Sequence, residues 1–177
     1  MKVRELMDKA DVKEMIGGYG KHVELDEAFV GGYTPGGQGG QGKTIVMGLK
    51  ERGGRIQTEV IPDTSTETLQ EVFHRNVKRG SIVSTDTHAG YRLLTKDGFW
   101  HGTVNHSKDE YANTDELGYR HHTNSVEGFW RLFKASVRGT HIHISPTYME
   151  KYLNEFTFRQ NHRHVGNAMF DVLIGAL

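Results

Sequence analysis

The chain has 177 residues, in which 22 lysines and arginines balance 22 aspartates and glutamates, and it contains no cysteine. This length is typical of one domain with its own core. The missing thiols exclude disulfides, zinc–thiolate sites and cysteine nucleophiles. No apolar run approaches the roughly 18 to 20 residues that cross a bilayer, and the charged first residues lack the apolar centre of a signal peptide. We therefore expect a cytoplasmic protein that does not contact a membrane.

The balanced total charge conceals a gradient along the chain. From Gly118 onward, seven lysines and arginines face four aspartates and glutamates, and six of the eleven histidines lie in the same third. A basic face at this end would suit a polyanionic partner such as nucleic acid. A difference of this size does not identify the partner by itself.

The first third of the chain predicts a helix followed by three strands. Residues 1–20 have the pattern of a short amphipathic helix that ends at a glycine pair. Residues 22–30, 43–52 and 55–61 are rich in β-branched and aromatic side chains, as strands are. Glycine-containing connections join these strands into an antiparallel meander. We treat residues 1–20 as a short N-terminal helical segment and residues 21–177 as the domain.

The remaining chain predicts helices that alternate with two further strands. In chain order, these are a helix after a capping box at Thr64 and Glu67, a strand over 81–85 that ends on Asp86, a helical stretch over 88–97, a strand over 100–104, a loop over 109–119, and helices from Asn124 and near Pro146. The helix from Asn124 has an apolar stripe, and the last helix is expected to turn four side chains inward: Tyr148, Tyr152, Leu153 and Phe156. This order predicts an α/β fold with a mixed five-stranded sheet and flanking helices, as in RNase H-like folds.

Three acidic residues occupy positions that suit metal chemistry. Asp26 lies within the first predicted strand, Asp86 at the end of the fourth, and Glu127 in the first turn of a long helix. Carboxylates can hold two divalent cations roughly 3.5–4 Å apart, which activate an attacking oxygen and stabilise a leaving oxygen in phosphodiester chemistry. Mg²⁺ prefers such hard oxygen ligands. Simpler interpretations stay open: a strand-edge aspartate, a turn aspartate, and a capping box that Asn124 forms with Glu127.

One face of the helix from Asn124 combines an acid with a row of cations. Its members recur at helical spacing: Glu127, Arg131, Lys134 and Arg138. The functional interpretation is a metal ligand beside a row of phosphate contacts. The alternative is a solvated ladder of salt bridges.

Four sequence runs carry a resemblance to a known family: VELDEAFVGG, GKTIVMGLKERGG, STDTHAGY, and the long run from HHTNSVEGFW to RQNHR. They resemble the integrase core of bacterial insertion-sequence transposases with a DDE motif. The similarity extends from about residue 22 to residue 163, and the last run is its most specific part. Full-length members of this group carry a zinc ribbon before the core. Here about 20 residues without cysteine precede the core, so we do not expect a zinc ribbon in this sequence.

The resemblance implies an RNase H-like catalytic core that cuts DNA at insertion-sequence ends and joins the 3′-OH to target DNA with two Mg²⁺ or Mn²⁺ ions. Asp26, Asp86 and Glu127 match the catalytic acids, and Lys134 matches a lysine that contacts DNA near the cut end. Asn124 is the alternative third catalytic position, because some members are described with asparagine there. Glu127 is preferred since it can carry charge to the metal. The candidate DNA-binding residues are Asn124, Arg131, Lys134, Arg138, Arg159 and Arg163.

The resemblance also implies a homo-oligomer on DNA, in a bacterial cytoplasm and associated with the nucleoid when DNA is bound. Two alternatives stay open. A related RNase H-fold nuclease would cut DNA without joining 3′-OH ends to a target. A non-catalytic or partner-dependent derivative of a transposase would bind DNA without metal-dependent cutting.

Residues 37–44 read GQGGQGKT and fit the P-loop pattern G-x-x-x-x-G-K-[ST]. That motif requires a helix directly after it, whose N-terminal amides cradle phosphate. The residues that follow here are β-branched and close in a glycine pair, as a hairpin strand does. We interpret the segment as a glycine-rich hairpin loop rather than a nucleotide site.

Further polar side chains gather towards the C-terminus. The histidine pairs His121-His122, His141-x-His143 and His162-x-His164 lack acids or thiols at fixed spacing, so zinc binding is a weak hypothesis. We expect them to flank DNA or cap helices. Arg159, Asn161 and Arg163 end the last helix, where phosphate contact and charge complementarity to the helix C-terminus are equal alternatives.

Overall fold

The structure is a computed structural model of the chain, and it describes residues 2–31, 42–92, 94, 98–141 and 144–177. The helices are α1 (Lys2–Ala10), α2 (Thr66–Asn76), α3 (Asn124–Ser136), α4 (Pro146–Asn161) and α5 (Met169–Ile174). The strands are β1 (Ile16–Gly17), β2 (His22–Val30), β3 (Thr44–Glu51), β4 (Ile56–Ile61), β5 (Val77–Lys78), β6 (Ile82–Asp86), β7 (Trp100–Val104), β8 (Asn113–Thr114) and β9 (Arg120–His121). Short helical turns are η1 (Ala89–Tyr91), η3 (His106–Lys108), η4 (Val137–His141) and η5 (Arg163–Ala168).

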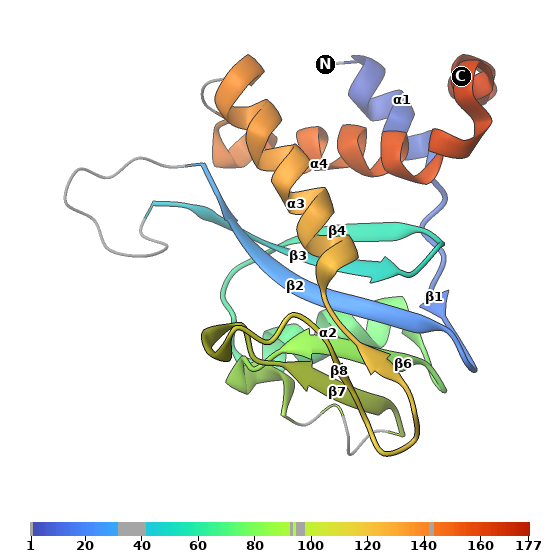
Figure 1. Cartoon of the computed structure of the whole chain (residues 1–177). Helices are drawn as coiled ribbons and strands as arrows, with labels where there is room; N and C mark the ends of the chain where they lie inside the picture. Colours follow the sequence, from blue (N-terminus) through green and yellow to red (C-terminus); the bar gives the residue numbers. More distant parts are fainter. Residues whose placement is uncertain (1, 32–41, 93, 95–97, 142–143) are drawn as a thin grey trace.

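A five-stranded mixed sheet lies at the centre of the molecule, in the order β4-β3-β2-β6-β7 (Figure 1). β2, β3 and β4 form the predicted antiparallel meander. β6 and β7 continue the sheet in parallel from β2. This topology confirms the predicted α/β class with an RNase H-like core.

Helices cover both faces of the sheet. Successive side chains of a strand point to opposite faces, so β2 contributes Val23 and Leu25 to one core and Ala28 and Val30 to another. α2 closes the first core, and α3 and α4 close the second (Figure 1). The three layers hold β2 at the centre, between two apolar cores. Among the described residues, no helix is both long and apolar enough to cross a membrane.

The N-terminal segment differs from its prediction as one helix. α1 ends at Ala10, and Ile16–Gly17 forms β1, which pairs in parallel with β5. Gly17 has a φ of +80°, and a Cβ at this position would lie 2.3 Å from the Ser81 hydroxyl oxygen, so a helix cannot continue through it. α1 itself packs on α4, where the Arg4 guanidinium lies 3.9 Å from the centre of the Tyr152 ring. The division of the chain at residue 20 stays a prediction.

The helices predicted from Asn124 and near Pro146 begin at these residues as α3 and α4, whereas α2 begins later than predicted. α2 takes Ser65 rather than Thr64 as its N-cap, and the Ser65 hydroxyl accepts a hydrogen bond from the Thr68 amide. This shift follows from Asp63, whose carboxylate accepts hydrogen bonds from the Ser65 amide and hydroxyl and holds Ser65 at the cap. Of the helical stretch predicted over 88–97, the described part forms only the short turn η1.

The inward faces of the last two helices are mostly as predicted. The apolar stripe of α3 is buried in full: Val126, Trp130, Phe133 and Val137. In α4, Leu153 is buried, but Tyr148 is 43% exposed, which contradicts its predicted inward position. The buried Met149 lies four positions before Leu153, so the core-facing row of α4 runs through Met149 and leaves Tyr148 towards solvent.

The P-loop pattern lies largely outside the described residues, because residues 37–41 are not among them. The described residues at its end show whether a helix or a strand follows the motif. Thr44 begins β3, so a strand follows the motif where a P-loop requires a helix. The hairpin interpretation of the flanking residues is confirmed.

Candidate active site

Asp26 and Asp86 lie on one face of the sheet. β2 and β6 are parallel, with Glu24 beside Ser84, and continuing this register by two residues brings Asp26 beside Asp86. Both have the same parity, so their side chains share a face. Asp26 also pairs with Gly48 of β3, where a Cβ would lie 2.6 Å from the Trp130 ring of α3. The two aspartates therefore face the layer that contains α3.

α3 brings Glu127 to the same face from its first turn. The Thr123 hydroxyl donates a hydrogen bond of 2.5 Å to Glu127 Oε1, and His106 Nε2 lies 3.0 Å from the same oxygen. The N-cap of α3 is Thr123, whose side chain makes no capping hydrogen bond. Asn124 is exposed. The alternative interpretation of Asn124 and Glu127 as a capping box is therefore wrong.

Electrostatics show that these acids are close to one another. The pKa of Asp26 is raised to about 8, first by burial and then by the negative charges of Glu27, Asp86 and Glu127. Lys134 opposes this rise. The chain thus places more negative charge around Asp26 than its own cations offset. A site with this imbalance favours a bound cation.

The acids do not converge on a single point. Within the described ranges, no group of three or more histidine, aspartate or glutamate side chains is arranged to hold a metal ion. Glu127 Oε1 is turned to Thr123, and Asp86 Oδ1 accepts a hydrogen bond of 2.9 Å from the His88 amide. Rotation of these side chains would be needed before all three carboxylates faced one ion. Their assignment as catalytic and metal-binding residues stays a prediction.

A fourth acid lies behind the candidate site on the opposite face of β2. The pKa of Glu27 is raised, above all by burial, and the neighbouring Asp86 adds to the rise, while the Tyr91 hydroxyl opposes it. Burial also raises the pKa of the Tyr91 phenol, and Glu27 adds to that rise. Tyr91 is buried and Glu27 is partly buried on this face of the sheet. Their position excludes Glu27 from the α3 face, where the three predicted acids lie.

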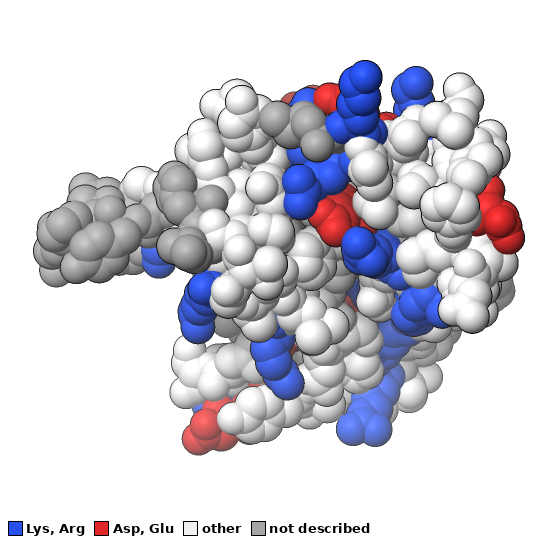
Figure 2. All heavy atoms as spheres, turned by 90° about the horizontal axis from the view of Figure 1, so that it is seen from above, with Lys and Arg blue, Asp and Glu red and all other residues white. Residues whose placement is uncertain are grey.

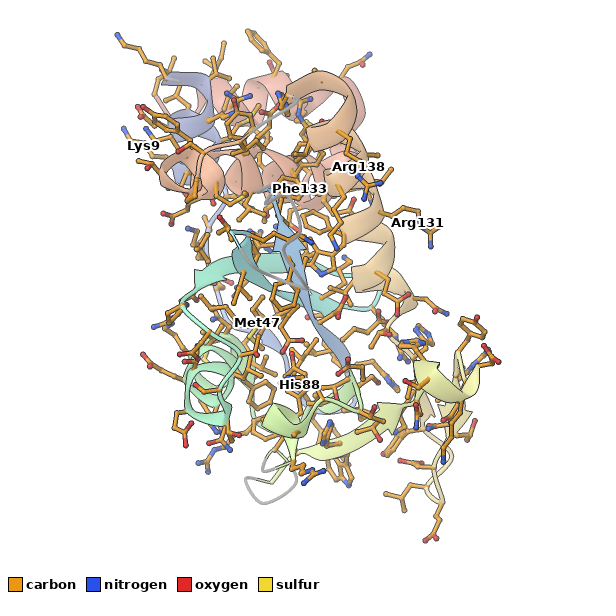
Figure 3. The ribbon with its side chains drawn as sticks, turned by 90° about the vertical axis from the view of Figure 1, so that its left-hand side faces the viewer. Lys9, Met47, His88, Arg131, Phe133 and Arg138 are labelled. Carbon is orange, nitrogen blue, oxygen red and sulfur yellow. The ribbon has the colours of Figure 1, made fainter. Side chains whose placement is uncertain are left out.

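The cations of α3 project from the helix in the predicted direction. Figure 3 shows Arg131 of α3 and Arg138 of the following turn η4 pointing outward, whereas Phe133 points into the core. Both arginines are exposed and Lys134 is half-buried. Seen from the side of the C-terminal helices, lysine and arginine side chains are spread over the surface and acidic side chains gather in a few places (Figure 2). The DNA-binding roles of these residues stay predictions.

The basic residues at the end of α4 lie in a different setting. Arg159 forms a salt bridge of 2.9 Å with Glu155, four residues earlier, and Arg163 donates a hydrogen bond to the Gln160 carbonyl. Asn161 is buried, and its amide bonds both backbone groups of Ile56 at the edge of the sheet. Asn161 therefore has a structural role, which contradicts its suggested contact with phosphate.

The histidine pairs do not form a zinc site among the described residues; His143 lies outside them. His121 is buried and contacts Ser84 and Asp115, at 3.0 and 3.1 Å. His162 is the C-cap of α4, and its ring contacts the Phe158 carbonyl at 2.9 Å. The expectation that these histidines cap helices is confirmed for His162, whereas His121 is part of the interior.

Strand order and helix layers define this chain as an RNase H-like α/β protein. Comparison with known proteins narrows the class. A sequence model described as the ISXO2-like transposase domain matches residues 16–161, which include the whole central sheet. The chain therefore belongs to this family of insertion-sequence transposases. It is also similar to an uncharacterized transposase-like protein of Haemophilus influenzae (strain ATCC 51907 / DSM 11121 / KW20 / Rd), with 29% identity over 111 residues that span 63% of this chain and 85% of that protein.

Two charged residues beside the site were missed in the sequence. Glu24 is fully buried on the same strand face as Asp26. The sequence of β2 could have predicted this burial. Because side chains alternate between the two faces of a strand, Glu24 lies on the same face as the apolar residues Ala28 and Val30. Arg52 follows β3 and contacts residues 28 to 70 positions away. Such distant contacts leave no local pattern.

Proposed function

We propose that this chain is the catalytic core of a DNA transposase, in which Asp26, Asp86 and Glu127 bind two divalent cations. The observation that carries the proposal is the raised pKa of Asp26, which burial causes first and the negative charges of Glu27, Asp86 and Glu127 increase further. The family of the chain points to DNA as the substrate.

The proposed reaction exchanges phosphodiester bonds in two steps. Water attacks the phosphodiester at a transposon end and releases a 3′-OH, which then attacks a phosphodiester of the target and displaces its 3′ oxygen. Bound Mg²⁺ or Mn²⁺ ions supply activation of the attacking oxygen and stabilisation of the leaving oxygen. Asp26 and Asp86 hold the cations from adjacent strands, and Glu127 completes the set from α3. Rigid strands and a helix start are suitable platforms, because small displacements of reacting groups are costly.

The basic face of α3 positions the DNA. Lys134 lies near enough to Asp26 to oppose the rise in its pKa, so a phosphate held by Lys134 would lie beside the acids. Arg131 and Arg138 extend the same face towards solvent (Figure 3). Such contacts fix the register of DNA without reading its sequence. By analogy with its family, the chain acts as a homo-oligomer that brings two DNA ends together.

One observation favours a second candidate function. The three carboxylates of the described chain are not arranged around a common ion, and this suits a derivative that binds DNA and cuts only with a partner, or does not cut. Metal-dependent cutting and joining of DNA distinguishes the catalytic core from the non-catalytic derivative.

The test is a strand-transfer assay with Mn²⁺, a labelled duplex that ends in a recessed 3′-OH, and a supercoiled plasmid target. We expect joined product from the wild type and at least about a hundredfold less from Asp86→Asn or Glu127→Gln, because loss of a ligand disrupts the metal pair. The matched control is Asp171→Asn, which removes an exposed acid on α5 and should keep wild-type activity. Equal joining by wild type and Asp86→Asn would refute the assignment. DNA binding without joining by any variant would favour the non-catalytic derivative.

A further inference from the structure

Glu24 is a buried acid that holds the start of α3. Its carboxylate accepts hydrogen bonds from the Ser125 amide at 2.7 Å, the Ser125 hydroxyl at 3.0 Å and the Val126 amide at 3.1 Å. The local N-cap, Thr123, supplies none of these bonds. A carboxylate at a helix N-terminus is favoured by the free amides and the helix dipole. Glu24 therefore caps α3 from β2. It lies two positions before Asp26 in the strand, and the amides that it binds directly precede Glu127 in the helix.

Arg52 binds Glu24 and extends the connection to other elements. Its Nε donates to Glu24 Oε1 at 2.7 Å, where the glutamate side chain is fully buried and the arginine side chain is 20% exposed. Its other nitrogens donate to the Arg120 carbonyl at 2.6 Å, the His122 carbonyl at 3.0 Å and the Ser84 hydroxyl at 3.3 Å. Both carbonyls belong to the segment that leads into α3, and Ser84 belongs to β6.

The contacts of this pair coincide with the elements of the candidate site. β2 carries Asp26, β6 carries Asp86, and α3 carries Glu127. Glu24 and Arg52 bond to all three elements, although neither side chain is one of the predicted ligands. Replacement of a buried ion pair by apolar residues of similar size is often neutral for stability. The fork of an arginine can bind several oxygens in fixed directions at once.

We propose that Glu24 and Arg52 are positioning residues that set the spacing of Asp26, Asp86 and Glu127 for cation binding. This inference rests on the proposed function. The pair fixes the start of α3 against β2 and β6, so the three carboxylates can reach one cation pair with only side-chain rotation. When the pair is broken, the helix start moves against the sheet and the carboxylates lose their common spacing.

The test measures Mn²⁺ affinity by isothermal titration calorimetry in the absence of DNA, together with amide hydrogen exchange over residues 124–128. Arg52→Gln should bind Mn²⁺ at least about tenfold more weakly than the wild type, because partners that orient metal ligands typically contribute a factor of 10 to 100. Exchange of the first-turn amides should be faster. Arg52→Lys should bind with intermediate affinity, since lysine keeps the charge but not the fork.

The matched control is Arg55→Gln, on the other side of the same turn. Arg55 also pairs with a mostly buried acid, Asp11, at 2.5 Å. Its guanidinium donates a second hydrogen bond to the Val12 carbonyl, so these bonds tie the turn to the segment after α1 rather than to β6 or α3. Arg55→Gln should therefore lose thermal stability without losing Mn²⁺ affinity.

Each outcome separates the inference from the proposed function. A folded Arg52→Gln variant with wild-type Mn²⁺ affinity would overturn the positioning role and leave the metal site standing. If Arg52→Gln does not fold, Arg52→Lys and Glu24→Gln decide, and wild-type affinity in both would overturn the role. If the wild type does not bind Mn²⁺, or if Asp86→Asn binds Mn²⁺ with wild-type affinity, the metal site and the positioning role are both contradicted.

Discussion

Asp26 shows how the sheet changes the chemistry of one side chain. An aspartate in solution has a pKa of about 3.9, but burial and three neighbouring carboxylates raise the pKa of Asp26 to about 8. Because the proton binds more tightly in the folded chain, the free energy of unfolding falls as the pH rises from about 4 to about 8. The metal-free protein therefore becomes less stable over this range through Asp26, and a cation that replaces the proton removes this loss.

Asp26→Asn should abolish this pH dependence. In buffer with EDTA, we compare the free energy of unfolding of the variant with that of the wild type at pH 5 and at pH 8.5. The difference should shift in favour of the variant by at least about 1 kcal/mol between the two pH values, since one pKa unit corresponds to about 1.4 kcal/mol. Urea unfolding at both pH values measures the difference. Asp171→Asn is the control, because its acid is exposed on α5. An equal effect of Asp26→Asn at both pH values would show that Asp26 is ionised in the folded chain.

At the scale of elements, the five strands of the central sheet and the starts of α3 and α4 followed from the sequence, but the group that caps α3 did not. β2 and β7 have the predicted bounds, because β-branched and aromatic residues at alternating positions specify a strand and its faces. The start of α3 depends on Glu24, about 100 residues earlier in the chain. A capping box of Asn124 with Glu127 was one of the alternatives left open, and it is absent because the carboxylate that caps α3 comes from β2. The sequence predicts Asp26, Asp86 and Glu127 as candidate site residues, but it does not predict the contacts of Glu127 with Thr123 and His106.

The contact of α3 with the sheet depends on a glycine. A Cβ on Gly48 would lie 2.6 Å from the Trp130 ring and 3.0 Å from Val126, so Gly48→Ala should push α3 from β3. We expect a loss of roughly 1–3 kcal/mol in the free energy of unfolding, as in overpacked cores. Gly128→Ala is the matched control on α3, since nothing lies within 4 Å of a Cβ there. It should be neutral or stabilising by up to about 1 kcal/mol. Thermal unfolding of both variants checks this, and a neutral Gly48→Ala would mean that α3 is not seated as described.

At the scale of the whole molecule, the fold places exposed cations near the three candidate acids. Lys9 lies on α1, and Arg131 and Arg138 lie on the far side of α3 (Figure 3). The acids gather at the sheet beside the start of α3. In the proposed function, a DNA phosphate on the α3 face would meet these cations first and the acids next. The total charge of the sequence hides this arrangement, because only the fold brings the basic helix and the acidic strand ends together.

Lys134→Glu should weaken DNA binding and lower its dependence on salt. The slope of log affinity against log salt should fall by about one for each phosphate that the protein no longer neutralises. Lys9→Glu makes the same change of charge on α1 and should leave the slope near that of the wild type. Fluorescence anisotropy with a labelled duplex over a series of KCl concentrations gives both slopes. Equal slopes for Lys134→Glu and Lys9→Glu would place the DNA on another face.

The most direct measurement of the metal site is the anomalous scattering of crystals grown with Mn²⁺. We predict two anomalous peaks about 3.5–4 Å apart, between Asp26 and Asp86 and within reach of Glu127 after its side chain has turned from Thr123. Crystals of Asp86→Asn should lose at least one peak. Manganese at the histidines alone, or peaks near Asp26 that persist unchanged in Asp86→Asn, would contradict the assignment of these three acids.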